Sequence, residues 1–228
     1  MRRALVPLLS IGCAGLLLTS LYQWQTTTLI RSQAVVDRFL EIWALAGNTW
    51  SANQFMGIQT WQNPMDAWVT LEIIHEVKPD VILEAGTFKG GSALLWAMFL
   101  EHVNPEGRVV TIDLTHRAFE ARTHKLALER IDFLLGSSTA PEIVEDVRQR
   151  VEGKRVLAIL DSAHTRDHVY AELQAYAPMI EVRSYIIVQD GAVCGHPLEA
   201  PPCPGPYEAV EDFLAETEDF VPGREHER

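Results

Sequence analysis

Two aspartates and a histidine carry the clearest chemical signal in the 228-residue sequence. Asp161 ends the apolar run RVLAILD, Asp190 ends the run SYIIVQD, and His164 follows the first of these runs in DSAHT. Carboxylates are preferred ligands of a hard cation such as Mg²⁺, and an imidazole titrates close to working pH. We therefore expect a metal site at Asp161 and Asp190, with Gln189 beside it and His164 taking a proton from a substrate hydroxyl.

Each of these assignments has an alternative. A single aspartate at a strand end commonly caps the following loop, and only the pair favours a metal. His164 could make a structural hydrogen bond at the start of a helix instead. His168, one turn later, competes with it as the base, and His196 in a loop is a weaker candidate.

A glycine-rich turn is the second signal, in the stretch VILEAGTFKGGS from Val81 to Ser92. It predicts a buried strand that turns sharply into a helix, with Gly86, Gly90 and Gly91 allowing positive φ and close approach of a ligand. The spacing lacks the GxGxxG and GxxxxGK[ST] of phosphate-binding loops. S-adenosylmethionine is a ligand that fits, and Asp113, ending the next run VVTID, is placed to hold ribose hydroxyls. A plain tight turn is the alternative.

The elements that must position these residues alternate along the chain. Strands are predicted at residues 81–85, 109–114, 131–135, 155–161 and 184–190. Helices are predicted at residues 64–77, 93–101, 165–177 and 206–214. Two more helices are expected, one that follows the second strand and ends at residue 130, and one that starts at a capping box at 139–142 and ends near 153. This alternation predicts an α/β fold, a doubly wound, mostly parallel Rossmann-like sheet. The first, fourth and fifth strands are neighbours in such a sheet, which brings Glu84, Asp161 and Asp190 to one edge.

The N-terminus has a different character from the rest. Residues 1–23 contain an uncharged apolar run after two arginines, which predicts an uncleaved membrane anchor. A cleaved signal sequence and a buried helix are the alternatives. Residues 24–62 are expected to form a helical connector, with an amphipathic helix over Leu29–Ala46 and a loop after it.

Composition narrows the class of protein. The chain is 47% apolar and 22% charged, as expected for one globular domain with an appendage. A net charge of −12 argues against a nucleic-acid partner. The cysteines Cys13, Cys194 and Cys203 form no CxxC motif, and Cys194 and Cys203 are expected to be reduced thiols. Their pairing is the alternative if the domain is exported.

Several motifs in order resemble the cephalosporin hydroxylase and rhamnosyl O-methyltransferase family. They are NPMDAW from Asn63, KPDVILEAGTFKGGS from Lys78, LDSAH from Leu160, QD at 189–190 and GPYEAV from Gly205. The resemblance covers residues 63–228. It implies a class I S-adenosylmethionine-dependent O-methyltransferase with Mg²⁺, acting on a hydroxyl of a sugar-containing or other specialised metabolite.

The resemblance also assigns residues. It implies that Asp161 and Asp190 are metal ligands and that His164 is the base. By the same resemblance Glu84, Gly86 and Asp113 become cofactor contacts. We expect Gly90, Gly91 and Ser92 of the glycine-rich turn to contact the cofactor as well. The sequence departs from the family at position 189, where Gln replaces a common Glu, and at the C-terminus, where a last strand is expected to be missing.

Two functions remain open at this point. The first is metal-assisted methyl transfer to a small-molecule hydroxyl acceptor, and the second is a membrane-tethered binding protein of the same fold with little or no activity. An oxidoreductase is disfavoured because the GxGxxG motif is missing. We expect the domain to face the cytosol, where S-adenosylmethionine is found, with export as the alternative. A homo-oligomer is left open.

Overall fold

The computed structural model describes Gln23, residues 33–223 and His226. The chain divides into two compact units, residues 1–45 and 46–228. Within the described part, no helix combines the length and the apolar character that a membrane crossing needs. The predicted anchor lies outside the described residues apart from Gln23, so it stays a prediction.

The first unit has one described helical stretch, residues 33–45. It falls inside the predicted helix Leu29–Ala46, whose first residues are not described. On the predicted apolar face, Val35, Val36 and Phe39 are all exposed.

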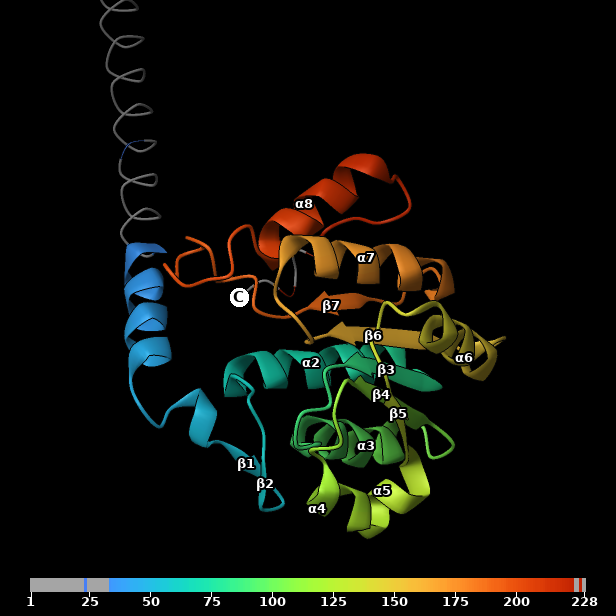
Figure 1. Cartoon of the computed structure of the whole chain (residues 1–228). Coiled ribbons are helices and arrows are strands. Elements are labelled where there is room, and N and C mark those ends of the chain that lie inside the picture. The colour runs from blue at the N-terminus through green and yellow to red at the C-terminus, as the bar shows by residue number, and fades with distance from the viewer. Residues whose placement is uncertain (1–22, 24–32, 224–225, 227–228) are drawn as a thin grey trace, which may run out of the picture. The chain divides into compact units, whose positions relative to one another are not determined.

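The second unit is built on a five-stranded sheet in the order β5-β4-β3-β6-β7 (Figure 1). The strands are β3 (Val81–Ala85), β4 (Arg108–Asp113), β5 (Ile131–Leu135), β6 (Val156–Leu160) and β7 (Ile186–Val188). All neighbouring strands are parallel. The chain starts at the centre, runs outward to β5, and then returns to the centre and runs to the other edge. The predicted α/β class is confirmed, as is the adjacency of the first, fourth and fifth strands.

Helices cover both faces of the sheet (Figure 1). On one face lie α2 (Pro64–Val77), α3 (Gly91–Val103) and the short α4 (Phe119–Thr123) and α5 (Lys125–Arg130). On the other face lie α6 (Pro141–Val151), α7 (Arg166–Tyr176) and α8 (Pro206–Glu216). Short 3-10 helices occur at Trp50–Ala52 and Ala177–Met179.

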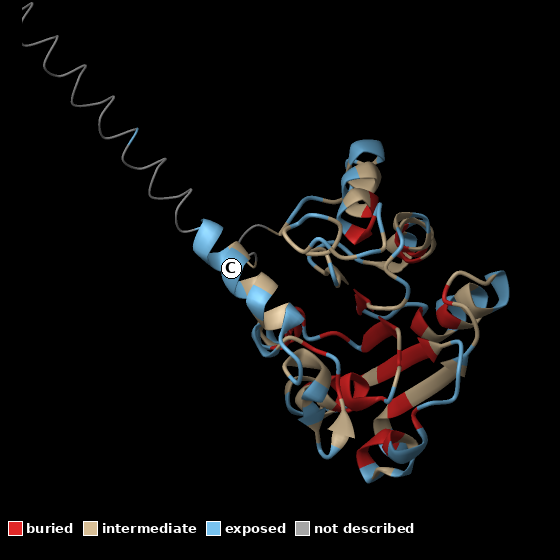
Figure 2. Ribbon diagram, turned by 60° about the vertical axis from the view of Figure 1, so that its left-hand side comes forward, coloured by how far each residue is buried: buried red, intermediate tan, exposed pale blue. Residues whose placement is uncertain are grey.

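The central strands β3 and β6 are apolar apart from Glu84, because both of their faces are covered. Every residue of β3 and β6 is buried, and Figure 2 shows the buried residues gathered in the sheet. Alternate residues enter opposite cores, so that Ile82 packs on the α3 side and Leu83 on the α7 side. Glu84 is in phase with Ile82, which directs its carboxylate towards α3.

Three local predictions were wrong. The predicted loop in the connector contains a hairpin, β1 (Gln54–Phe55) and β2 (Ile58–Gln59). Its turn residues Met56 and Gly57 both have positive φ, at 52° and 79°. Met-Gly is not one of the usual Asn-Gly or Asp-Gly signals for such a turn, and the hairpin is therefore not evident in the sequence.

The other two errors concern helices. The helix predicted up to Arg130 is interrupted at His124, which has extended φ and ψ of −69° and 137° and separates α4 from α5. The capping box predicted at Thr139 does not form, because α6 begins one residue later with Ala140 as its N-cap and no side-chain cap.

Candidate active site

The carboxyl ends of β3, β6 and β7 bring the candidate residues together. The amide N–H of Asp161 donates to Ala85 O at 2.8 Å, and that of Gln189 donates to Leu160 O at 2.9 Å. These bonds extend the parallel pairing past the strand ends. The glycine turn, Asp161 and Asp190 therefore lie side by side at one edge of the sheet, as predicted.

Three side chains at this edge form a cluster that could hold a metal ion. One ligand atom from each of Asp161, His164 and Asp190 lies within 4.8 Å of the others. His164 Nε2 lies 3.2 Å from Asp190 Oδ2. The structure thus groups His164 with the two aspartates. His164 could therefore bind the metal ion itself, as an alternative to its predicted role as the base. For Gln189 it shows only the backbone bond, and its place among the ligands stays a prediction.

The electrostatics of the cluster favour a cation. Burial raises the pKa of Asp161 well above its ordinary value, and the nearby charges of Asp190 and Glu84 raise it further. Burial also raises the pKa of Asp66, at the start of α2, with Asp190 contributing. Carboxylates crowded in this way are stabilised by a bound positive charge.

The glycines of the turn are required mainly by protein packing. Gly86 has φ +106°, and a Cβ there would lie 1.9 Å from Asp161 O. Gly90 has φ +84°, and its Cβ would lie 2.7 Å from that of Ala121. A Cβ on Gly91 would lie 1.7 Å from Thr60 Oγ1. The predicted positive φ is confirmed at Gly86 and Gly90, but the close approach is to other parts of the chain.

Glu84 lies beneath this turn and is 1% exposed. Its carboxylate accepts hydrogen bonds from Trp96 Nε1 at 2.9 Å and Thr111 Oγ1 at 2.6 Å, and the Ser92 hydroxyl also bonds to it. Burial, the largest cause, raises the pKa of Glu84 to about 7. Glu84 and Ser92 therefore form an internal network that supports the turn, and a direct cofactor contact would require one of these bonds to be exchanged.

Asp113 fixes the turn from the end of β4. Its Oδ2 accepts the amide N–H of Phe88 at 2.8 Å, and its Oδ1 accepts that of Thr115 at 2.8 Å. The Phe88 ring in turn stacks on Trp61, with centroids 4.2 Å apart. Asp113, which is predicted to hold ribose hydroxyls, thus already accepts a hydrogen bond from the glycine-rich turn.

A pocket of about 470 Å³ lies on the hairpin side of the turn. Its lining includes Gln59 of β2, Lys89 of the turn and Phe119 of α4, but none of the three residues of the metal-type cluster. It is therefore separate from the cluster.

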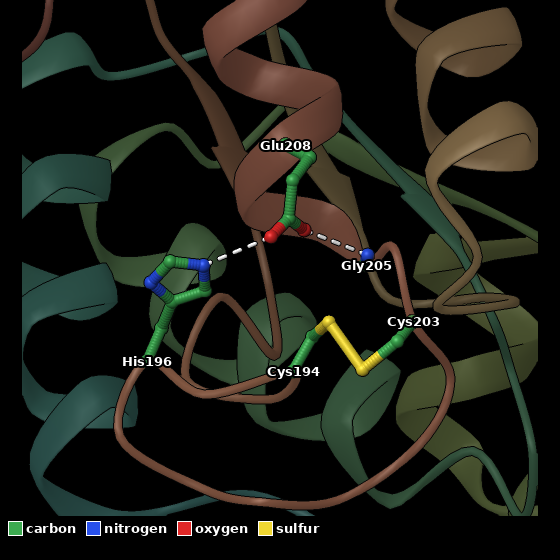
Figure 3. Close-up of a disulfide and its surroundings, with 5 residues drawn as sticks. All are labelled: Cys194, His196, Cys203, Gly205 and Glu208. Carbon is green, nitrogen blue, oxygen red and sulfur yellow. Dashed lines mark hydrogen bonds and ion pairs between the residues drawn. A yellow bond between two sulfur atoms is a disulfide. The ribbon is translucent and has the colours of Figure 1, made fainter.

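The loop after β7 contains a disulfide between Cys194 and Cys203, whose Cα atoms are 5.1 Å apart (Figure 3). The prediction of reduced thiols was wrong for this pair. The loop doubles back on itself, with Cys194 N donating to Ala200 O at 3.0 Å and Gly195 N to Leu198 O at 2.9 Å. This folding brings the two cysteines into bonding range, and their spacing in the sequence does not reveal it.

The same loop is fastened to α8. Glu208 accepts the amide N–H of Gly205 at 2.7 Å and lies 2.9 Å from Nε2 of His196 (Figure 3). Asp190 directly precedes this loop and has φ +57°. The disulfide and the bonds to α8 therefore limit the movement of the segment that follows a candidate metal ligand, and His196 has a structural partner.

A family model described as Rhamnosyl O-methyltransferase/CmcI matches residues 48–228. The chain belongs to this family. It is accordingly an S-adenosylmethionine-dependent O-methyltransferase.

The relatives of this O-methyltransferase include mycobacterial proteins named Rhamnosyl O-methyltransferase. Those of Mycobacterium bovis (strain BCG / Pasteur 1173P2) and Mycobacterium tuberculosis (strain ATCC 25618 / H37Rv) are 34% identical over 185 residues, covering 80% of this chain and 74% of theirs. That of Mycobacterium leprae (strain TN) is 32% identical over 177 residues, covering 76% of each.

Two solved structures share the fold of the O-methyltransferase. CmcI with Mg and S-adenosylmethionine has a TM-score of 0.53 at 20% identity, covering 66% of this chain and 65% of CmcI. Apo CalS11, a TDP-rhamnose 3'-O-methyltransferase of calicheamicin biosynthesis, has a TM-score of 0.52 at 20% identity, covering 70% of this chain and 75% of CalS11. At this identity the likeness establishes the fold alone.

Two residues of the site were missed at the level of sequence. Gln62 donates its Nε2 hydrogen to Asp161 Oδ2 at 2.8 Å, and Asp66 adds a further acid near Asp190. Both flank Pro64, the first residue of α2. A helix that packs antiparallel on the following strand begins near the carboxyl end of that strand. This rule could have placed Gln62 and Asp66, at the start of α2, near the candidate site at the carboxyl end of β3.

Proposed function

We propose that this O-methyltransferase methylates a sugar hydroxyl and that Asp161 and Asp190 hold a divalent cation next to the reacting oxygen. The cluster of Asp161, His164 and Asp190 at the carboxyl edge, one strand away from the glycine turn, carries the proposal. The mycobacterial relatives named for rhamnosyl methylation support a sugar as the acceptor.

The donors fit a cation. Two carboxylates and an imidazole lie within 4.8 Å, and the pKa of Asp161 is raised by burial and by like charges that a cation would offset. Carboxylates suit Mg²⁺, and an imidazole also admits Mn²⁺. When bound, the cation would lower the pKa of the acceptor hydroxyl, and S-adenosylmethionine would supply the methyl group.

The protein's own residues have separate tasks in this proposal. His164 Nε2 accepts the proton of the acceptor hydroxyl, which leaves the oxygen as the nucleophile. Asp113 exchanges its bond with Phe88 for bonds to ribose hydroxyls. The first N–H groups of α3, which begins at Gly91 without a side-chain cap, receive the carboxylate of the cofactor. Glu84 acts indirectly by supporting Ser92 and the turn.

A transfer assay tests the acceptor class. Purified protein is incubated with methyl-labelled S-adenosylmethionine, Mg²⁺ and a panel of glycosides that includes 4-nitrophenyl α-L-rhamnoside. We expect label in the rhamnoside, loss of transfer with EDTA, and recovery when Mg²⁺ is restored. Cofactor binding without transfer to any glycoside would contradict the sugar proposal, and transfer that resists EDTA would contradict the metal.

We also propose that the domain faces the cytosol, the source of its methyl donor. The disulfide between Cys194 and Cys203 argues against this placement, because disulfides persist mainly in oxidising compartments. Protease treatment of intact cells decides the question: a cytosolic domain stays protected, and cleavage of the domain would show that it is exported.

A further inference from the structure

Gln62 is the buried polar residue that comes closest to the cluster without a place in the reaction proposed above. It lies two residues before α2 and is 6% exposed. Its Nε2 donates to Asp161 Oδ2 at 2.8 Å, a contact across 99 positions of sequence. Gln62 therefore restrains one of the two aspartates from a segment far away in the sequence.

The other end of the same amide has no partner. Among the described residues, Gln62 Oε1 is buried and accepts no hydrogen bond. The two heteroatoms of an amide are about 2.3 Å apart by covalent geometry. Because Nε2 is in contact with Asp161, Oε1 must lie within about 5 Å of the Asp161 carboxylate. An unsatisfied acceptor is thus held directly beside the cluster.

We propose that Gln62 is a further ligand of the cation, contributing its amide oxygen beside the carboxylates of Asp161 and Asp190. This inference rests on the metal site of the proposed function. It adds a neutral donor from the start of α2 that the two strand-end aspartates do not provide.

The chemistry of the amide explains both states of the site. Without a cation, Asp161 is crowded by other acids, and the N–H end of the amide is the end that stabilises it. With a cation, the carboxylate is neutralised and a half-turn of the amide presents Oε1 to the ion. Amide oxygens are common ligands of hard divalent cations. A neutral ligand also adds no further negative charge to a crowded site.

Metal titration of the purified protein tests the inference without any turnover. Mn²⁺ alone is the probe, and free Mn²⁺ is measured by electron paramagnetic resonance. The variants are Gln62→Met, which keeps the length of the side chain but removes the amide, and Gln62→Glu, which keeps an oxygen donor. Gln59→Met is the matched control, since the Gln59 side chain donates to Ser51 O at 2.9 Å and, within the described part of the chain, makes no hydrogen bond to the cluster.

We expect Gln62→Met to weaken Mn²⁺ binding by about tenfold, while Gln62→Glu and Gln59→Met bind at least as tightly as the wild type. Gln62→Met with wild-type affinity would overturn the inference, as would equal weakening in Gln62→Glu. Asp161→Asn is measured in parallel. If both Gln62→Met and Asp161→Asn bind Mn²⁺ like the wild type, the metal site of the proposed function fails as a whole. If Asp161→Asn loses Mn²⁺ binding and Gln62→Met does not, only the role of Gln62 fails.

Discussion

The buried acid Glu84 makes a quantitative prediction about stability. Its pKa is raised from 4.5 to about 7, mainly by burial. An acid whose pKa is higher in the folded than in the unfolded protein contributes its full stability below the pKa of the unfolded state. This contribution is lost as the pH rises through the pKa of the folded state. The wild type should therefore lose stability between pH 4.5 and 7 because of this one carboxyl.

The size of the loss follows from the shift. A pKa raised from 4.5 to about 7 corresponds to about 3 kcal/mol in total, most of which is lost between pH 5 and pH 8. Glu84→Gln removes the titration but keeps the shape. Thr111 can accept from the new amide N–H, because its own hydroxyl can turn to Thr87, 2.7 Å away.

The assay is urea unfolding of both proteins at pH 5 and pH 8, followed by tryptophan fluorescence in EDTA. For each protein, the free energy of unfolding at pH 8 is subtracted from that at pH 5. The difference found for the variant is then subtracted from the difference found for the wild type. Titrating groups that do not interact with Glu84 cancel in this subtraction, whereas Asp161, whose pKa the Glu84 charge raises, contributes to the remainder. We expect a remainder of about 2–3 kcal/mol. A remainder below about 0.5 kcal/mol would refute the assignment of a proton to Glu84 in the folded protein.

Further predictions concern the cluster and its supports. Gly86→Ala should destabilise the protein by several kcal/mol, since the new Cβ would lie 1.9 Å from Asp161 O; thermal melting measures this, and an unchanged Tm would contradict the packing. His164→Ala should abolish methyl transfer but keep Mn²⁺ binding within about threefold if the imidazole is a base; loss of Mn²⁺ binding, measured by titration, would make it a ligand instead. Cys194→Ser should lower the free energy of unfolding by about 2–3 kcal/mol, because it opens a short closed loop; urea unfolding with and without reductant checks it, and a wild type insensitive to reductant would contradict it.

The sequence was sufficient where one local pattern decided the structure. The predicted bounds of β3, β5 and α2 match those observed, because each apolar stretch is closed by Pro, Gly or a change of period. The meeting of Asp161 and Asp190 was also predictable, since parallel strands that are neighbours end at the same edge.

The remainder depends on contacts between distant segments. The bond from Gln62 to Asp161 and the pairing of Cys194 with Cys203 depend on how loops close, which local propensity does not encode. Gly86 was correctly singled out, but the reason lay in Asp161, a residue 75 positions away. The types of residue at the site and the meeting of the two aspartates were therefore predictable, while the partners supplied by loops and distant segments were not.

The bond between Asp113 and Phe88 implies an order of events. In the exchange proposed above, ribose hydroxyls take the place of the Phe88 N–H on this carboxylate, and Phe88 carries the ring stacked on Trp61, which is 47% exposed. Arrival of the methyl donor would thus rearrange the aromatic surface before any sugar could settle there. We expect a compulsory sequence with the donor first, visible as S-adenosylhomocysteine inhibition that is competitive with the donor and non-competitive with the sugar.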